Sequence, residues 1–244
     1  MDNLRVATAE ERDFYYKTLY PLQDFVFSLL KGEPDIYLTG GTALARFYFQ
    51  HHLSEDIDLF IKVAPEDSPE TIASDRKTDI YARDLAGRLV RGLGSKFGSK
   101  CDIVNEHYGD MYSRFFIQTD ILSLKIDFVR EYSHIGATIP QPSGINLNNL
   151  EDMGASKISA FEDRAEIKDI IDLFYFTQQI PLPRLFELAD LKRVPVPYEH
   201  LLTINIQGIS GIALLEQTVD TAEVMDFIDL LKHETAQEVK KKRN

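Results

Sequence analysis

Asp56 and Asp58 stand two positions apart at the beginning of a segment in which apolar and polar residues alternate. Such alternation is typical of a β-strand, where side chains two apart point to the same face, roughly 6.5–7 Å from each other. Two carboxylates at that separation repel each other unless a positive charge lies between them. Mg²⁺ is the natural candidate, because it prefers hard oxygen ligands and keeps water and phosphate in its shell. Taken alone, the pair also fits two solvated acids at a strand end.

A Gly40-Gly41-Thr42 turn precedes the acidic pair and joins an apolar strand to a helix. Glycine lets the backbone approach a ligand closely, and a helix N-terminus offers N–H groups and a positive dipole end to phosphate. Thr42 either caps the helix or binds a phosphate oxygen. Because only one helix separates the turn from Asp56, we expect the two strands to be neighbours, with the phosphate cradle and the metal side by side.

Asp127 lies on another alternating segment, on the face opposite its apolar residues. A third carboxylate facing Asp56 and Asp58 completes a site for two divalent ions. In such a site one ion activates an attacking hydroxyl and the other clamps a leaving pyrophosphate. An isolated Asp127 would be an ordinary surface acid, so its assignment as a functional residue depends on the other two carboxylates.

The elements that position these residues follow from apolar spacing. Helices are predicted over 8–31, 42–51 and 79–97, and strands over 36–39, 56–63, 102–107, 112–119 and 121–129. A polar loop is predicted over 65–78, and the proline-containing stretch 136–149 is predicted to be a linker. From residue 150 onward the pattern is mostly helical, with helices expected within 163–178 and 221–238. His51 and His52 are expected at the end of the helix over 42–51.

The predicted fold class is α+β, with the site between two domains. A mixed-sheet core with an N-terminal helix spans 1–139, and a mainly helical C-terminal domain spans 140–244. The hydrophobic content of 44% is enough for a packed core. A single cysteine excludes an internal disulfide framework and a cysteine-rich zinc site.

The charge distribution limits the partners that the chain can have. The formal net charge is −12, so nucleic acid would have to bind at a local basic patch. The stretch Arg76–Lys100, which also holds Arg83, Arg88 and Arg91, is the candidate RNA surface, or else a solvated helix face. No apolar run approaches the ~20 residues that cross a bilayer, and the acidic start does not fit a secretory signal. We therefore expect a cytoplasmic protein with no membrane contact.

In combination, these motifs resemble a known family. The three segments are Gly40-Gly41-Thr42-Ala43-Leu44, then His52-Leu53-Ser54-Glu55-Asp56-Ile57-Asp58-Leu59-Phe60, then Asp127. Together they look like the polymerase-β-type nucleotidyltransferase superfamily, and within it the AbiEii/AbiGii-type toxins of abortive-infection and toxin–antitoxin systems. The second half is similar to the same family through Leu150–Phe161, which contains Lys157, and through Arg164, Lys168, Asp169 and Asp172. The resemblance covers roughly residues 36 to 176.

The resemblance implies an Mg²⁺-dependent nucleotidyltransferase, an enzyme of phosphorus-containing group transfer that uses a nucleoside triphosphate. Asp56, Asp58 and Asp127 would be metal ligands, and Gly40, Gly41, Thr42 and Ser54 would contact the nucleotide. Lys157 would reach the triphosphate or the active-site acids, with Asp169 supporting it. The acceptor is either a tRNA 3′ end or a protein hydroxyl, and the chain is expected to be the toxin of a pair with a cognate antitoxin. The family usually has arginine where this chain has His52.

Two alternatives remain open at the level of the sequence. A small-molecule nucleotidyltransferase, which modifies an antibiotic-like hydroxyl, would need a narrow acceptor pocket and no basic patch. A nucleotide-binding protein without turnover would bind the triphosphate and release no pyrophosphate. The three carboxylates disfavour the second alternative, whereas His52 in place of arginine keeps it open.

Overall fold

The computed structural model describes residues 3–63, 71–97, 101–108, 112–162, 166–205 and 209–243, but not the side chains of 71–82, 97, 101–108 and 162. The chain divides into two compact units. The sheet unit comprises Ala9–Ala43 and Ser54–Asn148, and the helical unit comprises Met1–Thr8, Leu44–Leu53 and Asn149–Asn244. The division into domains at residue 140 remains a prediction.

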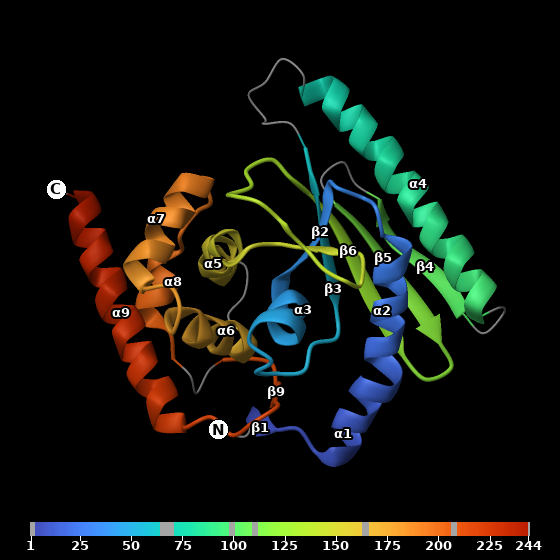
Figure 1. Cartoon of the computed structure of the whole chain (residues 1–244). Helices are drawn as coiled ribbons and strands as arrows, with labels where there is room; N and C mark the ends of the chain where they lie inside the picture. Colours follow the sequence, from blue (N-terminus) through green and yellow to red (C-terminus); the bar gives the residue numbers. More distant parts are fainter. Residues whose placement is uncertain are drawn as a thin grey trace. The chain divides into compact units, whose positions relative to one another are not determined.

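A mixed seven-stranded sheet forms the centre of the sheet unit, in the order β4-β5-β6-β3-β2-β8-β7 (Figure 1). Strand β3 runs parallel to β6 and antiparallel to β2. The bounds are β2 Ile36–Thr39, β3 Ile57–Lys62, β4 Cys101–Tyr108, β5 Tyr112–Thr119, β6 Ser123–Glu131, β7 Ile139–Pro140 and β8 Asn146–Leu147. The predicted α+β class with a mixed sheet is therefore confirmed.

Alternation explains why β3 and β6 face as they do. Ile57, Leu59 and Ile61 are buried, and Leu124, Ile126 and Phe128 are buried on β6. Helix α4 (Thr71–Phe97) packs over this apolar face, where its Leu89 and Leu93 meet β5 and β6. The polar side chains of β3 and β6 consequently project from the opposite face.

The N-terminal helical region is continuous but changes its winding. It consists of α1 (Ala9–Phe14), a π-helical segment (Tyr15–Leu19) and α2 (Tyr20–Leu29), which lies beside α4. Pro21 has no N–H and its ring would clash with the carbonyl four residues earlier, so the wider winding just before it accommodates the proline. A second π-helical segment (Leu44–Tyr48) follows α3 (Gly40–Ala43).

Three boundary predictions were wrong. Helix α4 begins at Thr71, inside the stretch predicted to be a loop, because helical hydrogen bonds are local and need no apolar stripe. The predicted linker 136–149 contains β7 and β8, which join the sheet through long-range hydrogen bonds such as Asn148 N to Leu38 O, 2.9 Å. The helix predicted over 42–51 ends at Tyr48, so His51 and His52 lie in an irregular segment.

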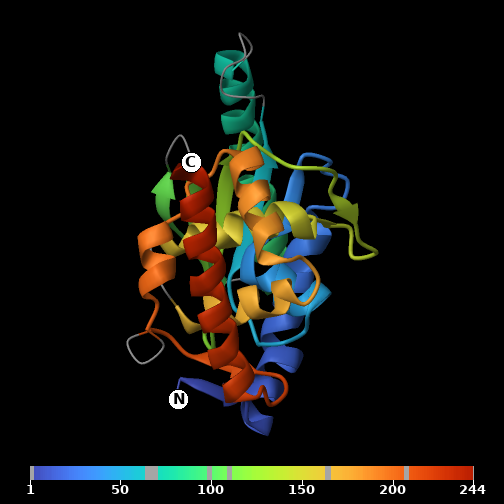
Figure 2. The same ribbon diagram turned by 90° about the vertical axis from the view of Figure 1, so that its left-hand side faces the viewer.

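The helical unit contains most of the second half of the chain (Figure 2). Helix α5 packs against α6 and α7, and α9 packs against α6, α7 and α8. The bounds are α5 Leu150–Ser159, the 3₁₀ segment η4 Ala160–Glu162, α6 Ile167–Thr177, α7 Leu182–Lys192, α8 Tyr198–Thr203 and α9 Thr221–Arg243. Strand β1 (Leu4–Val6) pairs in parallel with β9 (Ala213–Leu215), a pairing that local sequence does not reveal. No helix in the described ranges is both long and apolar enough to span a bilayer.

Candidate active site

Strand register aligns the predicted acids in one row across the sheet. Asp58 is paired with Thr39 on β2 and with Asp127 on β6, and Asp127 is paired with Arg114 on β5. Side chains of directly paired residues project from the same face of a sheet. The row therefore places two carboxylates on neighbouring strands, with Asp56 just before β3 begins.

The turn at Gly40 brings the backbone close to Asp58. Gly40 has a φ of +67°, a conformation that side-chain-bearing residues rarely adopt. A Cβ at this position would overlap Asp58 Oδ2 and would lie 3.1 Å from its Cγ. Gly41 is less constrained, since a Cβ there would meet Ser54 Oγ at 3.4 Å. Glycine at position 40 is thus required both by the backbone conformation and by the neighbouring carboxylate.

Hydrogen bonds from the turn and the N-terminal helices fix the loop before β3. The buried Thr42 hydroxyl lies 2.9 Å from Ser54 Oγ and donates to the Asp56 carbonyl. The fully buried Gln23 donates through Nε2 to the Glu55 carbonyl at 2.7 Å. The Tyr15 hydroxyl donates to the Glu55 carboxylate. Because these contacts occupy the Thr42 side chain, in this structure it positions the acidic loop.

Two basic side chains neutralise the acids, and the sequence prediction missed both of them. Arg114 makes a two-pronged contact with Asp127, Nε to Oδ1 at 2.7 Å and Nη2 to Oδ2 at 2.8 Å. Lys125 Nζ lies 2.6 Å from Asp56 Oδ2 and 3.9 Å from Asp127 Oδ2. The sequence held a signal for Lys125, which shares a strand face with Asp127. Arg114 becomes visible only through the β5–β6 register.

The acidic site fits a hard divalent cation. Carboxylate oxygens come from two adjacent strands, through Asp58 on β3, Asp127 on β6 and Asp56 just before β3. Oxygen atoms of this kind are the ligands that Mg²⁺ prefers. The Lys125 ammonium already places a positive charge between the carboxylates of Asp56 and Asp127. The position of this ammonium indicates that the electrostatic potential between the two carboxylates favours a cation.

Lys157 and Asp169 come together in the helical unit, with Asp172 as a third member. Lys157 Nζ lies 2.9 Å from Asp169 Oδ1 and 2.7 Å from Asp172 Oδ2. Asp169 Oδ2 also accepts from the Glu166 N–H at the start of α6, at 3.3 Å. The sequence prediction named Lys157 and Asp169 as functional residues. The structure adds Asp172 as a third member of this ion-pair cluster.

Burial and charge act in opposite directions on this set. Burial alone would lower the pKa of Lys157, but the charges of Asp172 and Asp169 outweigh it and hold that pKa above its usual value. Burial alone would raise the pKa of Asp172, yet Lys157 and two histidines hold it well below its usual range. Lys157 is therefore a cation, and Asp172 an anion, at neutral pH.

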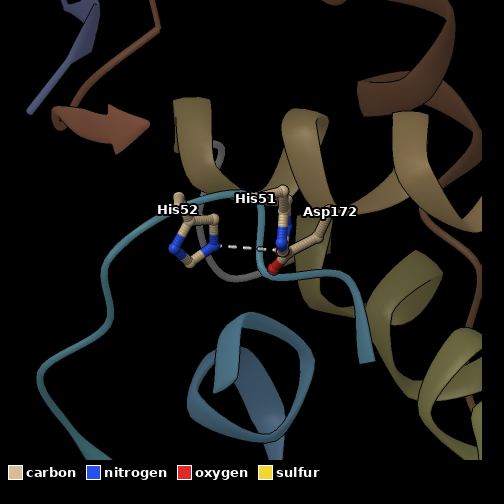
Figure 3. Close-up of side chains that lie close together, drawn as sticks. All are labelled: His51, His52 and Asp172. Carbon is tan, nitrogen blue, oxygen red and sulfur yellow. Dashed lines mark hydrogen bonds and ion pairs between the residues drawn. The ribbon is translucent and has the colours of Figure 1, made fainter. Parts of the chain in front are cut away.

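His51 and His52 both contact Asp172 (Figure 3). His51 Nε2 lies 2.6 Å from Asp172 Oδ1, and His52 Nε2 lies 3.0 Å from the same oxygen. All three side chains are buried, and burial lowers the pKa of His51. The histidines are thus part of a polar cluster inside the helical unit.

The predicted site residues fall into two groups. Those from the Gly-Gly turn, the acidic loop and β6 lie together in the sheet unit: Gly40, Gly41, Thr42, Ser54, Asp56, Asp58 and Asp127. Lys157 and Asp169 lie together in the helical unit. Convergence of the two groups on one nucleotide remains a prediction.

The candidate RNA stretch Arg76–Lys100 lies on α4 and partly outside the described residues. The side chains of Arg76 and Lys77, and the whole of Lys100, fall outside them. Arg83 and Arg91 are exposed. Arg88 forms ion pairs with Glu33 and with Asp84, the latter at 3.3 Å, so its charge is already compensated.

Comparison with known proteins places the chain in context. The family model described as nucleotidyl transferase AbiEii toxin, type IV TA system, matches residues 22–233. The curated proteins give no match.

Solved structures show the same fold at low sequence identity. MenT4, a nucleotidyltransferase toxin from Mycobacterium tuberculosis H37Rv, has a TM-score of 0.58 and 17% identity, covering 94% of this chain and 86% of its own. A candidate nucleotidyltransferase from H. pylori has a TM-score of 0.53 and 16% identity, covering 93% of this chain and 97% of its own. JHP933 from Helicobacter pylori has a TM-score of 0.52 and 15% identity, covering 97% of this chain and 98% of its own.

Proposed function

Because this chain belongs to the AbiEii nucleotidyl transferase toxin family, we propose that it transfers a nucleoside monophosphate from a nucleoside triphosphate to an acceptor hydroxyl, with Mg²⁺ as cofactor. Family membership makes it a nucleotidyltransferase of a toxin family. The metal, the nucleotide and the acceptor belong to the proposal. The observation that carries the proposal is the row of Asp58 and Asp127 on adjacent strands, with Asp56 beside it.

In the proposed site Asp56, Asp58 and Asp127 hold the metal. Bound divalent ions would supply activation of the acceptor hydroxyl and stabilisation of the leaving pyrophosphate. Gly40 leaves room for the Asp58 carboxylate, and Thr42 holds the loop that carries Asp56. Arg114 and Lys125 balance the carboxylates and offer positive charge to triphosphate oxygens.

Lys157 is proposed to bind the triphosphate. Its raised pKa keeps the ammonium charged at neutral pH, as binding of a polyphosphate requires. Asp169 and Asp172 orient the ammonium from two sides. The assignment rests on the family resemblance together with this buried arrangement.

The proposed acceptor is the 3′ end of tRNA, and the proposed partner is a cognate antitoxin. Exposed Arg83 and Arg91 on α4 support an RNA contact, because phosphate binding needs accessible positive side chains. The type IV toxin–antitoxin family and the likeness to MenT4 support the toxin role.

The experiment is a transfer assay with each labelled nucleoside triphosphate, Mg²⁺ and total tRNA. We expect one nucleotide to label tRNA in the wild type and an Asp58→Ala variant to be inactive. Asp120→Ala, which removes an exposed acid from the β5–β6 turn, serves as the matched control and should retain activity. If no nucleotide labels tRNA and Asp58→Ala behaves like the wild type, the tRNA proposal is wrong.

A second experiment distinguishes tRNA from a small-molecule acceptor. The double variant Arg83→Glu, Arg91→Glu reverses two exposed charges and leaves the Arg88 ion pairs intact. A tRNA acceptor predicts at least a tenfold loss of tRNA labelling, which added salt would imitate in the wild type. Unchanged labelling would exclude this surface as the RNA contact.

A further inference from the structure

The cluster of His51, His52 and Asp172 is held together by contacts within the helical unit. His52 forms an antiparallel bridge with Leu215, and the His51 carbonyl accepts from the Glu216 N–H at 3.0 Å. Asp172 lies in the second turn of α6. These backbone contacts direct two imidazole rings at one carboxylate oxygen (Figure 3).

The hydrogen-bond partners of His52 do not suit a neutral imidazole. A neutral ring carries one N–H donor and one lone pair. His52 Nε2 lies 3.0 Å from Asp172 Oδ1, and Nδ1 lies 3.0 Å from the Leu53 carbonyl, so both neighbours are acceptors. Either neutral tautomer therefore points a lone pair at an oxygen. The conflict is removed either by a second proton on the ring or by a cation bound between His52 Nε2 and Asp172.

His51 does not decide whether a proton or a metal ion supplies that charge. Its Nδ1 is buried and finds no hydrogen-bond partner in the described part of the chain. Full protonation of the ring and metal binding through Nε2 both leave an N–H on this nitrogen, so both carry the same cost. Lys157 is shared by Asp169 and Asp172, so its charge does not act on Asp172 alone.

We propose that His51 Nε2, His52 Nε2 and Asp172 Oδ1 bind one divalent transition metal ion of the Zn²⁺ class. One ligand atom from each residue lies within 4.8 Å of the other two. An ion bound at about 2.0–2.2 Å from all three would replace the hydrogen bonds of 2.6 and 3.0 Å and move the groups slightly apart. Two imidazoles with one carboxylate suit Zn²⁺ and not Mg²⁺, which prefers oxygen ligands alone. The bond from His52 Nδ1–H to the Leu53 carbonyl fixes the tautomer that presents Nε2 to the ion.

The surrounding charges set the affinity that the site can have. Lys157 holds the other oxygen of Asp172 at 2.7 Å, which orients the carboxylate but also repels a metal ion. Removing this ammonium should therefore tighten Zn²⁺ binding, an effect that a purely hydrogen-bonded cluster would not show. The proposal concerns a binding site within the helical unit and does not depend on nucleotidyl transfer.

The test is direct metal binding by the full chain without nucleotide. After removal of metal with a chelator, Co²⁺ is titrated and the visible absorption of the bound ion is followed, then displaced with Zn²⁺. An Asp58→Asn background separates this site from the acids of the sheet unit. In both proteins we expect one Co²⁺ per chain that Zn²⁺ displaces and Mg²⁺ does not, whereas Co²⁺ at the acids of the sheet unit in the wild type should be displaced by Mg²⁺.

Variants then assign the ligands. His51→Ala and the more conservative His52→Gln should each weaken Co²⁺ binding at least tenfold, whereas His233→Ala, on an exposed face of α9, should not. Lys157→Met should tighten binding, and circular dichroism reports whether each variant is folded. Equal binding by His51→Ala, His52→Gln and wild type would overturn the assignment. Absence of one-to-one binding by the wild type, with His52 doubly protonated in ¹⁵N NMR spectra, would show that a proton supplies the charge instead.

Discussion

Gly40→Ala tests whether the turn before α3 positions the carboxylate of Asp58. The new methyl group would overlap Asp58 Oδ2 and would lie 3.3 Å from its Cβ, so the side chain cannot stay in place. To restore ordinary contact the carboxylate must retreat by about 1 Å, and a misplacement of that size costs about 100-fold in rate. Alanine in the left-handed conformation at φ +67° adds about 1–2 kcal/mol of strain.

Two measurements separate the strain from the displacement. Urea unfolding gives the loss of stability, and the transfer rate as a function of Mg²⁺ concentration gives the effect on the site. Gly32→Ala is the matched control, because Gly32 also has a positive φ, +89°, but a Cβ there meets nothing within 4 Å. We expect similar destabilisation in both variants and loss of activity only in Gly40→Ala. If Gly40→Ala keeps more than half of the activity at unchanged Mg²⁺ dependence, the positioning argument is wrong.

The remaining predictions concern charge and buried hydrogen bonds. Lys157→Met removes the cation that two buried carboxylates share and should cost about 3–5 kcal/mol in urea unfolding; a loss below about 1 kcal/mol would contradict the ion-pair argument. Lys125→Ala removes an ammonium that competes with metal for Asp56, so half-maximal activity should need less Mg²⁺; an unchanged or higher requirement would contradict this competition. Gln23→Ala removes buried hydrogen bonds to backbone carbonyls and should lower stability by about 1–3 kcal/mol in thermal unfolding, unlike an exposed glutamine such as Gln118. Burial raises the pKa of Tyr48 to about 12, so the neutral phenol stabilises the folded chain below its ordinary pKa of about 10. This contribution is lost as pH rises toward 12, and Tyr48→Phe should show a weaker fall in stability over that range.

Local patterns predicted the strands that carry the acids, because alternation is a property of adjacent residues. Asp58 and Asp127 were assigned to the polar faces of two strands, and the structure shows both strands where the alternation places them. Their pairing depends on the order of strands in the sheet, which involves residues far apart in the chain. The sequence therefore supported a third carboxylate near the pair without determining its register.

Long-range pairing also explains the main omissions. The segment with Pro140 and Gly144 has the composition of a linker, yet Asn146 donates to the Glu33 and Ile36 carbonyls at 3.1 and 3.3 Å and helps to bring β8 beside β2. Arg114 lies opposite Asp127 only because β5 and β6 pair in one register. Neither contact can be predicted from the pattern of apolar and polar residues within a single segment.

The two histidines show how a local interpretation can miss a buried cluster. His51 and His52 follow an amphipathic segment, and adjacent polar residues there are usually exposed ends of a helix. The π-helical winding ends this segment at Tyr48, and the chain then extends to pair with β9. Extended backbone sends neighbouring side chains in different directions, yet both rings reach the same oxygen of Asp172. This convergence requires contacts from outside the segment, and the backbone contacts with β9 hold His51 and His52 in this way. A metal ion or a proton shared by the three side chains would therefore depend on the tertiary fold and could not be predicted from the adjacent histidines alone.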